Sequence, residues 1–241
     1  GFLIPVVVGY LIWQKRKELE KTEAKGSWSG LFLVLVALFS YYFGEVCSME
    51  FATRISLVLW IYGSVVFLFG YAVCRVLLFP LVFLLFMIPL PYLVYDSIAF
   101  PLKIVASRTA TTMLGLTGIP VYLEGNIISL PTMVLEVADA CSGIRSLFSL
   151  FALASIVAYL GNKNNLIRGI IIMSAVPVAV LTNTFRIFGT GVLVDLGYKQ
   201  IAEGFFHSFS GWFVSIFGFC LILGASRIGV FLETRKDNIN R

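Results

Sequence analysis

Three side chains with catalytic potential stand at the ends of apolar stretches. Cys141 opens one stretch in "ADACSGIRSLF", Arg186 closes another in "LTNTFRIFG", and His207, the only histidine, opens a third in "FFHSFSGW". A thiol becomes a nucleophile on deprotonation, and a histidine can take that proton and return it to a leaving amine. An arginine holds a carboxylate or a developing oxyanion. We therefore predict these three as catalytic residues for acyl transfer through a thioester.

Two further polar residues share helical faces with this set. Arg145 follows Cys141 by four residues, and Asn183 precedes Arg186 by three. Arg145 adds positive potential that favours a thiolate, and Asn183 can donate to a carbonyl or orient Arg186. We predict both as substrate-binding residues.

Each of these residue types also has a simpler explanation. A single cysteine at a helix start is usually structural, an interfacial histidine is usually a polar anchor, and an arginine at a span end usually reaches toward the headgroups. No pair among Cys47, Cys74, Cys141 and Cys220 has the spacing of metal ligands, so no metal site is predicted. The case for a site depends on whether the fold brings the three residues together.

The composition indicates a membrane protein. The 241 residues are 59% hydrophobic and 13% charged, about half the charge of a soluble domain, and the mean hydropathy is +0.94. The net charge of +5 comes from basic residues in the loops between apolar stretches, which indicates membrane topology and argues against nucleic acid as a partner.

Apolar stretches of about 20 residues predict the spans. We expect an all-α polytopic membrane protein, a bundle of about seven to eight transmembrane helices in one domain. The stretch 187–206 can be a short span, a re-entrant piece or an interfacial helix. The predicted spans are 1–13 (partial), 28–47, 55–74, 76–95, 141–160, 167–186 and 207–227.

The basic residues predict the orientation. Most of the 18 lysines and arginines fall on the side of the loop 14–27 and the tail 228–241, which is therefore cytoplasmic. This orientation puts Cys141, Arg186 and His207 at one depth, on the extracytoplasmic face of the cytoplasmic (inner) membrane. That shared depth is the main argument for a common site.

The longest extracytoplasmic segment is 96–140. Its first part has apolar residues at helical spacing and predicts an interfacial helix. The second part, "VYLEGNIISL", has strand formers on both sides of "EGN" and predicts a short hairpin before Cys141. We divide the single domain into N-terminal spans 1–95, this segment, and catalytic spans 141–227.

Three sequence blocks resemble the exosortase/archaeosortase family of multi-spanning membrane cysteine transpeptidases or proteases. These blocks are "EVADACSGIRS" (136–146), "NTFR" (183–186) and "HSFSGW" (207–212), and the approach "GIPVYLEGNIISLP" (118–131) is also similar. The resemblance covers about 96–227, and a histidine in the third block is typical of the bacterial exosortases.

The resemblance implies a nucleophilic Cys141 assisted by Arg186 and His207, with no metal or organic cofactor. Its substrates are exported, membrane-anchored proteins with a C-terminal sorting signal: a motif such as Pro-Glu-Pro, a transmembrane helix and a basic tail. The implied reaction is cleavage at the motif, followed by transfer to an unidentified acceptor or by release.

Two other functions remain open at this point. A transporter or channel would use Arg186 and His207 to bind an anion or relay protons, and replacing Cys141 would then be nearly silent. A non-catalytic scaffold of an export or polysaccharide system would tolerate replacement of all three residues.

Overall fold

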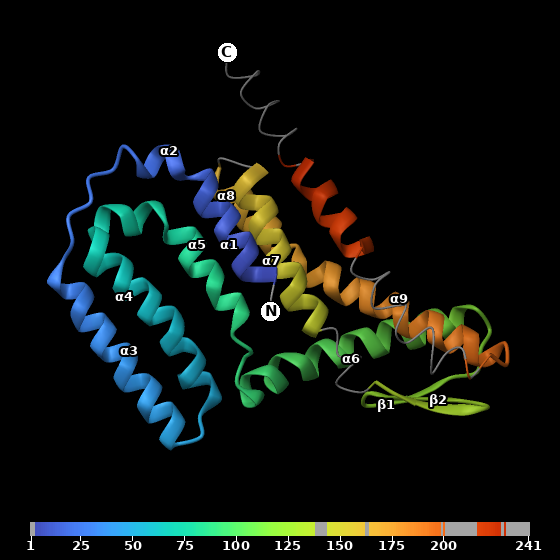
Figure 1. The fold of residues 1–241 in the computed structure, drawn as a ribbon. Coiled ribbons are helices and arrows are strands. Elements are labelled where there is room, and N and C mark those ends of the chain that lie inside the picture. Colours follow the sequence, from blue (N-terminus) through green and yellow to red (C-terminus); the bar gives the residue numbers. More distant parts are fainter. Residues whose placement is uncertain are drawn as a thin grey trace, which may run out of the picture. The chain divides into compact units, whose positions relative to one another are not determined.

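The computed structural model describes residues 3–137, 144–161, 164–198, 200, 216–227 and 229. Within these ranges the chain is mostly helical (Figure 1). The chain divides into two compact units, residues 1–92 and 93–241. The helical fold class predicted from composition is therefore confirmed in its coarse form.

The N-terminal unit contains five α-helices and one short 3₁₀ helix. Helix α1 packs on the α5–η1 segment, where Val8 and Leu11 are buried. The elements are α1 (Leu3–Gln14), α2 (Arg16–Leu19), α3 (Trp28–Val46), α4 (Glu50–Val76), α5 (Leu78–Phe83) and η1 (Leu84–Met87).

Helices α3 and α4 form a tightly packed antiparallel hairpin. A Cβ atom added at Gly30 would collide with the backbone of Phe67, and one at Gly63 would come 2.9 Å from the backbone nitrogen of Val34. Small residues allow backbones to approach closely, which is how helices associate in a membrane where lipid is as apolar as the side chains. These two helices correspond to the predicted spans 28–47 and 55–74.

The span predicted at 76–95 is not one continuous helix. Helix α5 runs into η1, which ends at Met87, and α6 (Tyr92–Leu116) begins after Pro89 and Pro91. Proline lacks the N–H that a helix interior needs and disfavours helical geometry in the residue before it, so two prolines in three positions interrupt the helix.

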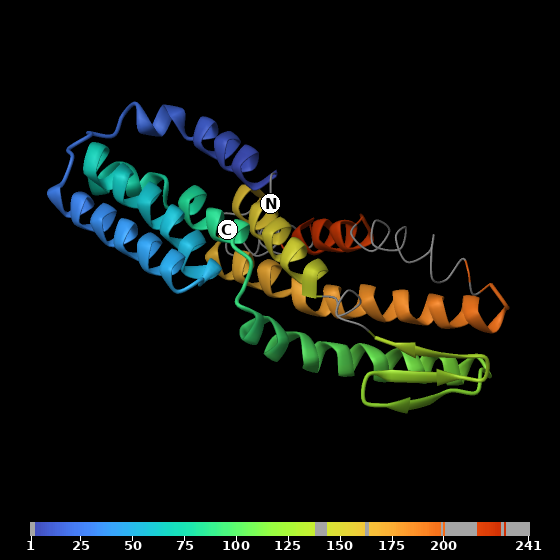
Figure 2. The ribbon, with the colours of Figure 1, turned by 60° about the horizontal axis from the view of Figure 1, so that its bottom comes forward.

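The second unit is built around α6 and α9. It contains α6, the strands β1 (Tyr122–Glu124), β2 (Ile127–Leu130) and β3 (Met133–Glu136), then α7 (Ile144–Gly161), α8 (Asn165–Met173), α9 (Ala175–Asp195) and a helix over Ile216–Arg227. Figure 2 shows α6 and α9 running alongside each other toward the end that carries the sheet. At that end Leu114 of α6 shares a buried cluster with Val194 of α9.

The predicted hairpin is confirmed and extended by a third strand. β1 pairs with β2 and β2 with β3, all antiparallel, with Glu124 opposite Ile127 at the turn. Gly125 has a φ of 61°, a positive value that tight two-residue hairpin turns require and that glycine adopts readily. Ile128 and Leu130 of β2 are buried in the clusters that contain residues of α6, so the sheet packs on the C-terminal half of that helix.

Membrane-spanning capacity is clear for part of the chain. By length and composition, three described helical segments can cross a bilayer, Trp28–Val46, Glu50–Val76 and Asn165–Asp195, or four if Leu78–Met87 and Tyr92–Leu116 form one broken span. Shorter apolar helices lie at Leu3–Gln14, Ser146–Gly161 and Ile216–Arg227. The larger total of seven to eight spans and the interfacial placement of α6 stay predictions.

The ambiguous stretch after residue 186 is partly resolved. Helix α9 continues into this stretch and ends at Asp195, so residues 187–195 belong to the same helix as Arg186. Arg186 therefore lies within α9 and not at its end.

Candidate active site

Two of the five predicted site residues have described side chains. Asn183 and Arg186 lie on α9, while Arg145 is placed only by its backbone, in the first turn of α7. Cys141 and His207 lie outside the described residues, so their predicted roles stay predictions.

Arg186 buries part of its guanidinium group. Its Nε and Nη2 atoms are shielded from solvent and have no hydrogen-bond partner in the described part of the chain. An arginine inside a membrane-spanning helix is costly, and a buried donor without a partner adds a desolvation penalty of about 1–3 kcal/mol. A group kept at this cost is a candidate for binding a ligand.

Asn183 is the second unpartnered donor on α9. The residue is only 3% exposed, and its Nδ2 atom has no partner among the described residues. It precedes Arg186 by three residues, so both side chains lie on neighbouring positions of one helix surface. Thr184, 1% exposed, has a buried hydroxyl that is also unpartnered there.

Helix α6 contributes two more unpartnered groups that the sequence prediction missed. The hydroxyl oxygens of Ser107 and Thr111 are buried and have no partner within the described ranges. Ala106 and Ala110, their neighbours on α6, share a buried cluster with Ile187, the neighbour of Arg186 on α9. The two sets of polar groups therefore lie on helix segments that pack into the same part of the core.

We call these five residues the polar layer: Ser107, Thr111, Asn183, Thr184 and Arg186. Closer to the sheet, the two helices make direct contact, because a Cβ atom added at Gly191 of α9 would come 2.8 Å from the side chain of Leu114. Toward their N-termini, Ala99 of α6 and Ala179 of α9 share a cluster with Leu147 of α7. The polar layer thus lies between two apolar contact regions.

A sequence signal for the α6 half was present. Lys103, Ser107 and Thr111 recur at intervals of four, which places them on one helix face, and Lys103 is also buried at 6% exposure. In the sequence these residues resembled scattered polar positions of an interfacial helix. The clue was their regular four-residue spacing, which puts three polar residues on one face of a largely apolar helix.

The chemistry of the layer is that of an oxygen-binding site. The unpartnered nitrogens of Asn183 and Arg186 only donate, and Arg186 brings the only formal charge among the five residues. Carbonyl and carboxylate oxygens complement such a set, and a carboxylate can accept two bonds from one guanidinium group.

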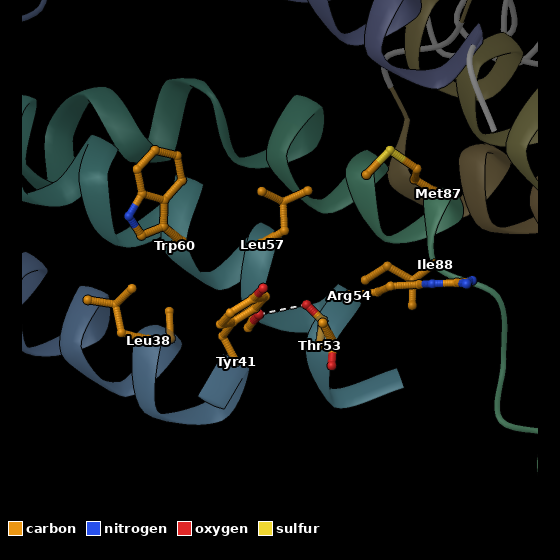
Figure 3. A pocket seen from close by; sticks show the side chains of 10 residues that line it. Leu38, Tyr41, Thr53, Arg54, Leu57, Trp60, Met87 and Ile88 are labelled. Carbon is orange, nitrogen blue, oxygen red and sulfur yellow. Dashed lines mark hydrogen bonds between the residues drawn. The ribbon is translucent and has the colours of Figure 1, made fainter. Parts of the chain in front are cut away.

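A separate cavity lies in the N-terminal unit, between α3, α4 and the end of η1 (Figure 3). Its volume is about 610 Å³, and its lining residues are Ala37, Leu38, Tyr41, Thr53, Arg54, Ser56, Leu57, Trp60, Met87 and Ile88. Two polar residues of its lining are already bonded to neighbours: Arg54 pairs with Glu50 at 2.7 Å, and Ser56 Oγ donates to the Thr53 carbonyl at 2.7 Å. No predicted site residue lines it, so unpartnered polar groups indicate the candidate site better than cavity volume does.

The fold and the polar layer define a helical membrane protein with a partly buried arginine in its second unit. The family description "Transmembrane exosortase" matches residues 1–224, nearly the whole chain. The protein belongs to the transmembrane exosortase family, which confirms the resemblance seen in the sequence blocks. Comparison with curated proteins and with solved structures gave no significant match.

Proposed function

We propose that this protein is a membrane-embedded cysteine endopeptidase or transpeptidase that cleaves C-terminal sorting signals of exported proteins. Its substrates are membrane-anchored proteins that end in a Pro-Glu-Pro-like motif, a transmembrane helix and a basic tail. The reaction takes place at the extracytoplasmic face of the inner membrane. Family membership supports this proposal, together with the two buried guanidinium nitrogens of Arg186 that have no partner in the described part of the chain.

The roles of the three predicted residues follow from their chemistry. His207 accepts the thiol proton, and the Sγ atom of Cys141 attacks the scissile carbonyl carbon. The peptide C–N bond breaks, the proton passes to the departing amine, and the acyl group stays on Cys141 as a thioester. Water or an acceptor amine then attacks the thioester and restores the thiol, so exclusion of water decides between release and transfer.

Arg186 stabilises charge in this scheme. Its donors hold either the oxyanion that forms on the scissile carbonyl or the carboxylate of a motif glutamate. Arg145 and Asn183 bind the substrate beside it. The observation that carries this part is the pair of buried, unpartnered donors on Arg186 and Asn183, because such donors are stabilised when a ligand supplies oxygen acceptors.

The first test is co-expression with a tagged substrate that carries the complete sorting signal. The wild-type protein should shorten the substrate, and the Cys141→Ala variant should leave it at full length while still inserting into the membrane. Trapping a covalent thioester between Cys141 and the substrate identifies the nucleophile directly.

Matched thiol controls are available among the described residues. Cys220 and Cys47 are exposed free cysteines, so Cys220→Ala and Cys47→Ala should process the substrate normally. A Cys141→Ala variant that still shortens the substrate would overturn the proposed mechanism. If replacing Cys141 has no effect on activity, and that activity depends on an ion gradient, the protein is a transporter.

A further inference from the structure

The hydroxyl groups of α6 fall into two classes. Thr109 Oγ1 donates to the Val105 carbonyl and Thr112 Oγ1 to the Arg108 carbonyl, both at 2.9 Å, and both residues are exposed. The buried hydroxyls of Ser107 and Thr111 make no such bond. Helical serine and threonine can satisfy themselves on the carbonyl one turn back, and buried groups have the greater need to do so. The observed pattern is the reverse.

Helix α9 carries bonded and unbonded hydroxyls as well, and there a buried threonine, Thr182 at 1% exposure, is among the bonded ones. Thr182 Oγ1 donates to the carbonyl of Val178 at 2.8 Å, and Thr190 Oγ1 donates to that of Arg186 at 2.9 Å. Thr184, which lies between them and is also buried, has a hydroxyl with no partner among the described residues, and the same holds for the Nδ2 atom of Asn183. On both helices, therefore, the residues that forgo hydrogen bonds are those of the polar layer. Polar groups left unsatisfied at a cost in stability are typical of functional sites.

The spacing on α6 fits a peptide main chain. Ser107 and Thr111 are four residues apart, which is about 6 Å along a helix axis at 1.5 Å per residue. In an extended peptide, carbonyls on the same side recur every second residue, about 6.6 Å apart. Two hydroxyls at this interval can donate to alternate carbonyls of one extended segment that lies along α6.

We infer that Ser107 and Thr111 bind the main chain of an extended substrate peptide, whose acidic or scissile group is held by Asn183 and Arg186. This inference rests on the proposed function and adds α6 to the substrate-binding surface. It makes the two hydroxyls substrate-binding residues, with no part in the chemical step.

The first experiment measures stability without substrate. The purified Ser107→Ala/Thr111→Val variant should unfold at the same temperature as wild type or higher, because it removes two unsatisfied buried groups. A lower unfolding temperature than that of the Thr109→Val/Thr112→Val control would show that the buried hydroxyls have structural partners, and would overturn the inference. The control residues are exposed and bonded to their own helix.

The second experiment measures processing of a synthetic peptide that carries a Pro-Glu-Pro motif, an apolar helix and a basic tail. Loss of each hydroxyl should raise KM about fivefold with kcat nearly unchanged, as expected for one lost hydrogen bond to the substrate. The Ser107→Thr and Thr111→Ser variants keep a hydroxyl and should recover most of the affinity. The Thr109→Val/Thr112→Val control should keep the wild-type KM.

The outcomes separate this inference from the proposed function. If Cys141→Ala is inactive and the Ser107→Ala/Thr111→Val variant keeps the wild-type KM, the inference fails and the proposed function stands. If Cys141→Ala retains cleavage, the proposed function fails. If the wild-type protein neither binds nor cleaves the peptide, both the proposed function and the binding of a substrate peptide at the polar layer are contradicted.

Discussion

Asn183 and Arg186, three residues apart on α9, both bury nitrogen donors that have no hydrogen-bond partner in the described part of the chain. Some polar residues of the second unit outside the polar layer are satisfied by nearby groups. Arg168, for example, donates to the Tyr159 carbonyl and to the Asn165 side chain, each at 3.3 Å. The contrast between Arg168 and Arg186 separates an arginine with a structural role from one available for a ligand.

Replacing Arg186 should abolish most substrate processing while leaving the protein folded. In Arg186→Lys the charge remains but the forked donor set is lost, so we expect the rate to fall about 100-fold or more. The rate of shortening of a tagged sorting-signal substrate, in membranes with equal amounts of protein, measures this. Arg168→Lys is the matched control and should process the substrate at nearly the wild-type rate.

The same pair of variants tests whether Arg186 contacts a motif glutamate. If it does, changing that glutamate to glutamine should slow the wild-type enzyme strongly and Arg186→Lys only slightly further, because both changes remove one interaction. Fully additive effects would show that Arg186 acts elsewhere, with the oxyanion as the remaining candidate.

The contact between α6 and α9 should be sensitive to volume. Gly191→Val places new atoms against Leu114, and overpacking of this kind costs about 1–3 kcal/mol. Leu114→Ala alone opens a cavity at a fully buried position and costs about 2–5 kcal/mol. The combined variant should lose less stability than the sum of the two, measured by thermal unfolding in detergent. Additive losses would contradict a direct contact between these residues.

The sequence was a good guide wherever a local signal decided the structure. The "EGN" turn predicted the hairpin, since strand formers flank a glycine that tolerates positive φ, and Gly125 has that conformation. The apolar lengths near 28–47 and 55–74 predicted α3 and α4. At 76–95 hydropathy alone missed the break, because Pro89 and Pro91 are apolar enough to keep the average high while they disrupt the helix.

The site was harder to predict because it depends on contacts between distant helices. Arg186 and Asn183 could be recognised from their place in a motif block. Ser107 and Thr111 are ordinary helical hydroxyls in sequence, like those of Thr109 and Thr112. Their four-residue spacing from Lys103 places them on one face, but only burial and the missing hydrogen bonds mark that face as a site. No local propensity encodes which face of α6 packs into the core.

The α3–α4 hairpin should depend on the absence of a side chain at Gly30. In Gly30→Ala the new methyl group meets the backbone of Phe67, which can move only if the helices separate, so we expect a loss of about 1–3 kcal/mol in the free energy of unfolding. Gly9→Ala in α1 is the control, because a Cβ atom there meets nothing within 4 Å. It should be neutral or stabilising by up to about 1 kcal/mol through helix propensity. Equal behaviour of the two variants would contradict close packing of α3 on α4.

The turn at Gly125 should tolerate asparagine better than alanine. Its φ of 61° lies in the left-handed region, where a non-glycine residue costs about 1–2 kcal/mol, and asparagine is the side chain most readily accommodated there. A Cβ atom at this position meets nothing within 4 Å, so the cost is purely conformational. Gly125→Ala should therefore lower the unfolding temperature more than Gly125→Asn does. Strain at the turn favours local opening of the β1–β2 pair, so the alanine variant should also speed hydrogen exchange at the β1–β2 amides. Exchange in the α3–α4 hairpin should stay unchanged.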